Sequence, residues 1–186
     1  QIGEEPIFDV GLRLVVRNTT EADAHNVQVT DNLGQTFNAG APKITIQSGP
    51  TLELLTAPGA RTAAPASLTM DANAAAAGLT LSPAYNGTTT PTLLRGDDTL
   101  PAGHEQAITM TVRVAYPSSM AIPVDTDLSN TAVVTTSVTP GGTVITRDES
   151  TDVTSTAADP QSTDTPHPTV IRLTPAARLV VQKVAS

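Results

Sequence analysis

The chain has 186 residues, of which 39% are hydrophobic and only 2% aromatic, and its formal net charge at pH 7 is −8. This composition allows a packed core of aliphatic side chains, and it argues against sites that stack sugars or bases on aromatic rings and against basic surfaces that bind nucleic acid. The absence of cysteine excludes disulfides and thiolate chemistry, and no apolar run approaches the ~20 residues that span a bilayer.

The first part of the chain has the period-two alternation of half-buried β-strands. Residues 8–20 form the first such segment, and Val27 and Val29 alternate with polar residues in the second. The inward face of the first segment comprises Val10, Leu12, Leu14 and Val16. We therefore expect two framework strands here.

Residues 34–98 have a less regular pattern, which predicts a decorated insertion between framework strands. Short strand-like pieces lie at 43–46, 52–55, 67–70 and 79–81. One short helix is expected over 71–78, because Asp71 suits its N-cap and Gly78 its C-terminal end.

Regular alternation resumes after residue 98. The clearest strand is predicted at 106–116, with Ile108, Met110, Val112, Val114 and Tyr116 facing inward. A second strand follows, with Leu128, Ala132, Val134 and Val138 inward, and then a Pro140–Gly142 turn. Further strand is expected at 144–146 and 152–156. Short strands bounded by turn signals predict an all-β immunoglobulin-like Greek-key sandwich over residues 1–157.

The C-terminal part divides into two pieces. Residues 159–168 contain three prolines and no apolar residue, so we expect an extended Pro/Thr-rich linker over 158–176. Residues 177–186 alternate again, with Leu179 and Val181 on one face. They predict a detached C-terminal strand, which is either donated to a neighbour or is the first strand of a next domain.

Several short motifs resemble one known family. They are LVVRNTT at 14–20, HNVQVTDNL at 25–33, LPAGHE at 100–105, LSNTAVVTT at 128–136 and ARLVVQKV at 177–184. Together they resemble the bacterial conserved-repeat immunoglobulin-like surface domain known as domain of unknown function eleven, with its opening strand displaced to the end. The resemblance covers the framework strands and leaves out residues 34–98 and 158–175. It implies an exported stalk or spacer without enzymatic activity.

The resemblance leads to a structural function. We expect a subunit of a bacterial extracellular fibre, stalk or surface layer, whose partners are copies of itself joined head to tail. Strand donation would place Leu179, Val180, Val181 and Val184 in a neighbour. Two alternatives stay open, namely a spacer repeat cut from a tandem-repeat surface adhesin, and an adhesive module that binds a surface or host ligand through residues 34–98. No enzyme is expected, since the chain has no nucleophile motif such as Gly-x-Ser-x-Gly.

Related fimbrial domains form internal isopeptide bonds, and the resemblance transfers the parts of that site to this chain. Lys183 would be the amine, Asn130 the side chain that it attacks, and Asp31 or Asp9 the acid. Period two places Lys183, Asn130 and Asp31 on inward faces and Asp9 on an outward face. The alternative is that Asn130 binds backbone groups and Lys183 lies at a strand end.

Acidic residues on predicted loops are weak candidates for calcium. Asp125, Asp127, Asp148 and Asp152 offer the oxygen ligands that calcium prefers. Their spacing matches no known loop motif, so we expect solvated acidic turns and no cofactor, with calcium as the alternative.

Overall fold

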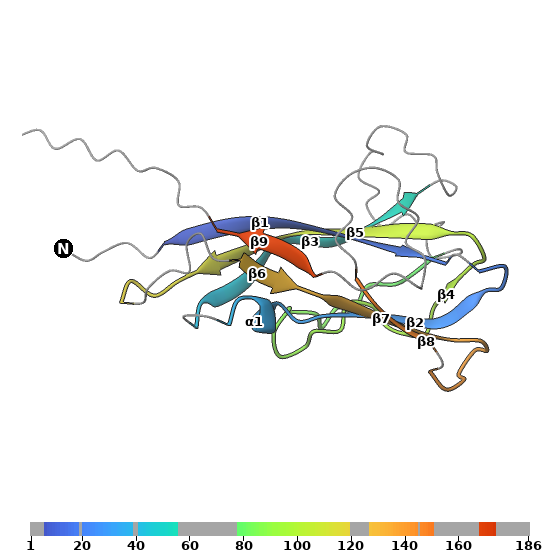
Figure 1. Ribbon diagram of the computed structural model, residues 1–186. Helices are drawn as coiled ribbons and strands as arrows, with labels where there is room; N and C mark the ends of the chain where they lie inside the picture. The colour runs from blue at the N-terminus through green and yellow to red at the C-terminus, as the bar shows by residue number, and fades with distance from the viewer. Residues whose placement is uncertain are drawn as a thin grey trace, which may run out of the picture.

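The computed structural model describes residues 6–18, 20–38, 41–55, 78–119, 127–144, 146–150 and 168–173. They form antiparallel strands and one four-residue helix, which confirms the predicted all-β class (Figure 1). The helix expected over 71–78 and the strand pieces at 67–70, 152–156 and 177–186 lie outside the described residues, apart from Gly78. Within the described part, no helix has the length and apolar character to cross a bilayer.

The larger part of the core is built on a three-stranded sheet. It contains β1 (Ile7–Arg17), β5 (Glu105–Ala115) and β3 (Lys43–Leu55), in the order β1-β5-β3. All inward side chains predicted for β5 and for Tyr116 after it are buried, because β5 is the central strand. On the edge strand β1 the predicted inward face is also correct, but Val10, Leu12 and Leu14 are only half-buried.

β3 differs from the irregular insertion that the sequence predicts. The expected pieces at 43–46 and 52–55 belong to one 13-residue strand that pairs with β5 along its length. The register shifts twice between Ile46 and Thr51, around the cis peptide bond from Gly49 to Pro50. The alternation is therefore broken in the sequence although the strand continues.

The second sheet has the order β4-β2-β7-β8. Its strands are β4 (Thr99–Leu100), β2 (Ala24–Asp31), β7 (Ala132–Ser137) and β8 (Thr146–Glu149). Val27 and Val29 are buried as predicted.

The inward position predicted for Val138 is wrong, since its side chain is 63% exposed and Ser137 is buried instead. The reason is that β7 ends at Ser137, so Val138 lies in the bend that follows the strand. The Asn26 amide donates to the Ser137 hydroxyl at 2.6 Å, which holds this hydroxyl inward.

A two-stranded sheet pairs β6 (Asp127–Asn130) with β9 (Thr169–Arg172). β6 leads directly into β7, which pairs with β2 and β8, so β8 and β9 pair with successive parts of one stretch, 127–137. Of the range 158–176, for which a linker was expected, the structure describes 168–173, and four of these residues form β9.

One hydrophobic cluster joins side chains of all three sheets, including Val27 of β2, Ile108 of β5 and Leu128 of β6. Leu173, directly after β9, is also buried in it. The short helix α1 (Leu33–Thr36) closes this core, because Leu33 and the following Phe37 are fully buried. Its first turn is held by Asn32, whose side chain accepts a hydrogen bond from the Gln35 amide.

Candidate functional site

Four polar side chains lie buried near the junction of β2, β6 and α1. Asp31 ends β2, Asn130 ends β6, Thr36 ends α1, and Tyr85 follows in the loop 82–91. We call these four residues the interior polar cluster. Asp31 has no exposed surface and Asn130 is 3% exposed, so water does not reach their functional groups from outside.

Strand pairing explains why these residues meet. Asp31 pairs with Ala132 across β2 and β7, and Asn130 lies two residues before Ala132 on the same inward face. The Thr36 hydroxyl donates to Asn130 Oδ1 at 2.6 Å, which fixes the orientation of the amide. The backbone N–H of Asp31 donates to the Pro91 carbonyl at 2.9 Å, so the carboxyl group is held at a defined position.

The carboxyl group of Asp31 is not compensated. Neither of its oxygens, nor the Tyr85 hydroxyl, has a hydrogen-bond partner in the part of the chain that the structure describes. Burial raises the pKa of Asp31 from its ordinary value of 3.8 to about 6. The neighbouring Asn130 side chain acts in the opposite direction, although its contact with the carboxyl group does not meet the geometry of a hydrogen bond. Burial, together with the nearby charge of Asp31, raises the pKa of Tyr85.

An unpaired buried carboxylate is costly unless it takes up a proton or meets a cation. In the described structure, the protonated form of Asp31 is therefore favoured over the carboxylate. Because Asp31 has a pKa of about 6, it can also exchange a proton near neutral pH.

The structure brings together two of the residues that the sequence predicts for an isopeptide site, Asp31 and Asn130. Asp9, the alternative acid, faces outward as predicted and forms two 2.8 Å contacts with Arg113, which lower its pKa. Lys183 lies outside the described residues. The other lysine of the chain, Lys43, is exposed at the start of β3.

Sequence reasoning missed Thr36 and Tyr85, which both lie in the range interpreted as an insertion. One signal for this loop is present at Gly87, which has a φ of +73°. A Cβ atom there would lie 2.7 Å from a side-chain carbon of Leu33, so only glycine lets the loop pack against α1. The turn residues Asn86 and Gly87 thus place Tyr85 beside the helix.

Of the four calcium candidates, the structure describes Asp127 and Asp148, which lie on different strands. Asp127 on β6 binds Arg172 of β9 at 2.5 Å, and Asp148 on β8 accepts a hydrogen bond from the Glu149 amide. Asp125 and Asp152 lie outside the described residues. Among the residues that the structure describes, no three His, Cys, Asp or Glu side chains are grouped as a metal site requires.

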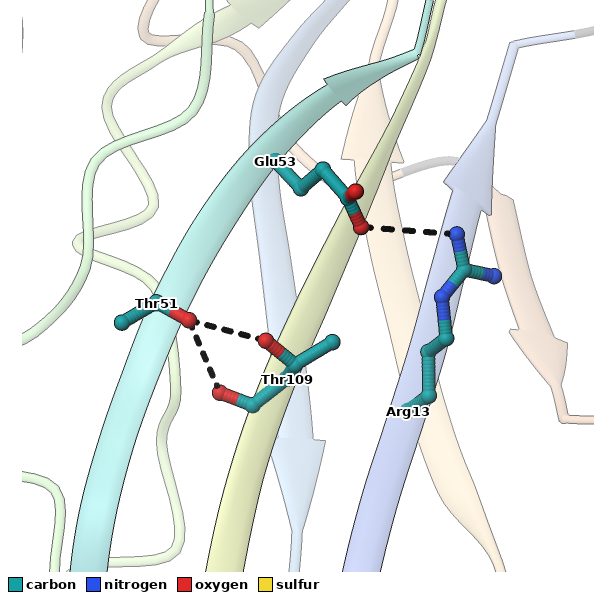
Figure 2. Close-up of polar contacts among 4 residues, drawn as sticks. All are labelled: Arg13, Thr51, Glu53 and Thr109. Carbon is teal, nitrogen blue, oxygen red and sulfur yellow. Dashed lines mark hydrogen bonds and ion pairs between the residues drawn. The ribbon is translucent and has the colours of Figure 1, made fainter. Parts of the chain in front are cut away.

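A second polar group lies on the outer face of the three-stranded sheet, and Figure 2 shows it. Arg13 of β1 contacts Glu53 of β3 at 3.5 Å, and the hydroxyls of Thr51 on β3 and Thr109 on β5 are 2.8 Å apart. We call these four residues the outer polar row. A shallow groove of about 370 Å³ passes over Gly11, whose missing side chain leaves open space there.

No family model, curated protein or solved structure matches the chain. The interior polar cluster and the edges of the sheets are therefore the features of the chain that bear on its function.

Proposed function

We propose that the chain is a structural subunit of a bacterial extracellular fibre, stalk or surface layer, assembled head to tail by donation of residues 177–186. The observation that carries this proposal is incomplete burial at the edges of the three-stranded sheet. The core-facing Phe8, Val10 and Leu12 of β1 are half-buried, whereas the core-facing side chains of the adjacent β5 are buried.

An added strand would complete such a sheet. It would form main-chain hydrogen bonds with an edge strand, and its inward Leu179 and Val181 would extend the apolar row of the core. Val180 and Val184 would lie on the opposite face. A contact between the end of one copy and the body of the next does not close on itself, so it produces a filament.

A pair of substitutions in the full chain tests this proposal. Leu179→Asp places a charge on the inward face of the donated strand, and Gln182→Asp adds the same charge on its outward face. We expect fibres of the unmodified chain by electron microscopy, loss of fibres with L179D, and fibres with Q182D. A monodisperse monomer of the unmodified chain, or fibres of L179D, would contradict the proposal.

The interior polar cluster favours a second proposal, a covalent bond between subunits. In this reaction the Lys183 amine of the donated strand attacks the side-chain carbonyl carbon of Asn130. A new amide bond forms, ammonia leaves, and Asp31 transfers the proton from the amine to the leaving group. The adjacent, buried positions of Asp31 and Asn130 and the raised pKa of Asp31 support this chemistry.

Mass spectrometry under denaturing conditions tests the covalent proposal. We expect boiling-resistant oligomers whose mass is lower by one ammonia for each bond. Lys183→Arg, Asn130→Ala and Asp31→Asn should each abolish the bond, and Lys43→Arg is the matched control that should retain it. An unmodified monomer mass for the assembled chain would exclude the bond and leave non-covalent strand donation in place.

A further inference from the structure

We infer that the edge that accepts the donated strand is the free edge of β1, and that its occupant is residues 177–186 of a second copy, running antiparallel to β1. This inference rests on the proposed function, and it adds the acceptor site and the direction of the strand.

The three-stranded sheet has two long edges, and they differ in regularity. β3 is interrupted by two register shifts between Ile46 and Thr51, and Pro50 has no N–H to donate. Irregular strands and edge prolines are features that prevent the addition of further strands. The edge of β3 is therefore protected.

The edge of β1 has no such protection. Its 11 residues pair with β5 without interruption, from Ile7 opposite Ala115 to Arg17 opposite Glu105, and they include no proline. The edge thus presents a regular row of backbone donors and acceptors. In the described part of the chain, β4, β6, β8 and β9 have four residues or fewer, which is too short for a ten-residue partner.

Both faces of β1 suit an apolar partner strand. The inward Leu14 is half-buried, and Val181 would cover it in the register that places Val180 opposite Val15. On the outward face Val15 is 45% exposed, which is where the donated Val180 would pack.

Charged residues do not obstruct the outward face of β1. Its outward charges are paired with the neighbouring strands, in the pairs Asp9–Arg113, Arg13–Glu53 and Arg17–Glu105. The donated segment has Arg178 and Lys183 and no acidic residue, whereas the chain as a whole has a formal net charge of −8. Long-range attraction therefore favours the encounter of the segment with another copy.

The path of the chain indicates a second copy. Asp31 of β2 lies opposite Ala132 at the start of β7, and β6 and β9 continue from there toward the end of the molecule where β1 begins (Figure 1). The chain leaves β9 at this end, whereas an antiparallel partner of β1 has to start at the opposite end, beside Arg17.

The connecting residues are too few for the same copy to reach that start. An 11-residue strand is about 36 Å long, and residues 174–176 extend over at most about 11 Å. Every strand pair in the described part is antiparallel. A strand from the same copy could only run parallel to β1, so the antiparallel partner comes from a second copy.

Disulfide trapping in the full chain tests this inference, because the chain has no native cysteine. Val15 lies near the Arg17 end of β1. In the antiparallel arrangement it is close to Val180, and in a parallel arrangement it is close to Val184. Val180 and Val184 are about 13 Å apart on one face of an extended strand, and a disulfide requires Cα atoms within about 7 Å. Each cysteine pair therefore reports one arrangement.

We expect V15C/V180C to give a ladder of reducible oligomers under mild oxidation, with at least tenfold lower yield for V15C/V184C. Thr51→Cys, at an exposed position on β3, provides the matched control for the other edge when it is combined with V180C, because an antiparallel strand on β3 would place Val180 close to Thr51. A disulfide within the monomer of V15C/V184C would overturn the inference in favour of the same chain, and a ladder with T51C/V180C would overturn it in favour of β3.

Strand donation and the choice of the β1 edge are tested separately. If the unmodified chain forms fibres and no cysteine pair crosslinks, the β1 edge is wrong and strand donation at another place survives. If the unmodified chain stays monomeric, the proposed function is wrong as well.

Discussion

The interior polar cluster and the outer polar row contain similar chemical groups in opposite surroundings. In the outer polar row, Arg13 and Glu53 lie on the surface of the sheet, and the hydroxyls of Thr51 and Thr109 contact each other (Figure 2). In the interior polar cluster, Asp31 is fully buried and its two oxygens have no partner in the described part of the chain. The outer groups can exchange partners with water, and the inner ones cannot.

This difference indicates which of the polar groups bear on the function of the chain. Contacts on the surface replace equivalent contacts with water, so they change stability little and can be kept for solubility. A buried carboxylate without a partner lowers stability, and a folded chain that contains one has a use for it or a partner that arrives later. Lys183 of a donated strand would be such a partner.

The largest effect is expected from Asp31→Asn in the monomeric chain. The pKa of Asp31 rises from 3.8 to about 6 on folding, so the folded state favours the protonated form. The resulting stabilisation is fully present below pH 3.8 and is lost as the pH rises through about 6. At pH 8, D31N should therefore raise the free energy of unfolding by about 3 kcal/mol, and at pH 3.5 it should change it little. Urea unfolding at the two pH values measures both.

Asp9→Asn is the control for this prediction. Asp9 is exposed, and Arg113 lowers its pKa, so its neutralisation should not stabilise the chain at pH 8. If D31N instead lowers stability at pH 8, Asp31 has a cationic partner within the same folded chain. That outcome would contradict the uncompensated carboxylate described above.

A smaller change in the free energy of unfolding is expected when a threonine is replaced by valine, once in the interior polar cluster and once in the outer polar row. Thr36→Val removes the donor to Asn130 Oδ1 and leaves a buried acceptor without a partner, which should lower the free energy of unfolding by about 1–2 kcal/mol. Thr51→Val removes an exposed hydroxyl from a strand, where valine is favoured, and should change it by less than about 0.5 kcal/mol. Equal effects of T36V and T51V on chemical denaturation would contradict the distinction between the regions.

The sequence predicts those parts of the fold in which alternation is unbroken. β1 and β5 have the expected faces because each side chain on a regular strand alternates between core and solvent. For β3 the sequence predicts separate pieces, because Gly49 and Pro50 interrupt its pattern while pairing with β5 continues. For β9 the sequence predicts a linker, because the strand is only four residues long, follows a proline-rich stretch and pairs with β6 through a long-range contact.

The same reasons apply to the candidate site. Asp31 and Asn130 were assigned to inward faces by period two, and both are buried. Thr36 and Tyr85 join them through α1 and a loop, whose packing depends on Gly87 and Leu33 and has no periodic signal. Local patterns thus predict which way a strand residue faces, and they do not predict which loops meet it.

The smallest effect is expected for the ion pair of the outer polar row. A double-mutant cycle with Arg13→Ala and Glu53→Ala should give a coupling energy of about 0.5 kcal/mol, because the Arg13 side chain is 48% exposed and the two groups are 3.5 Å apart. Screening should reduce that energy to near zero in 1 M salt, whereas the effect of D31N should persist because Asp31 is shielded from salt by burial. A coupling above about 2 kcal/mol that persists in 1 M salt would show that Arg13 and Glu53 are covered by another part of the chain. The outer face of the three-stranded sheet would then be covered, and the edge of β1 would not be open to a second copy.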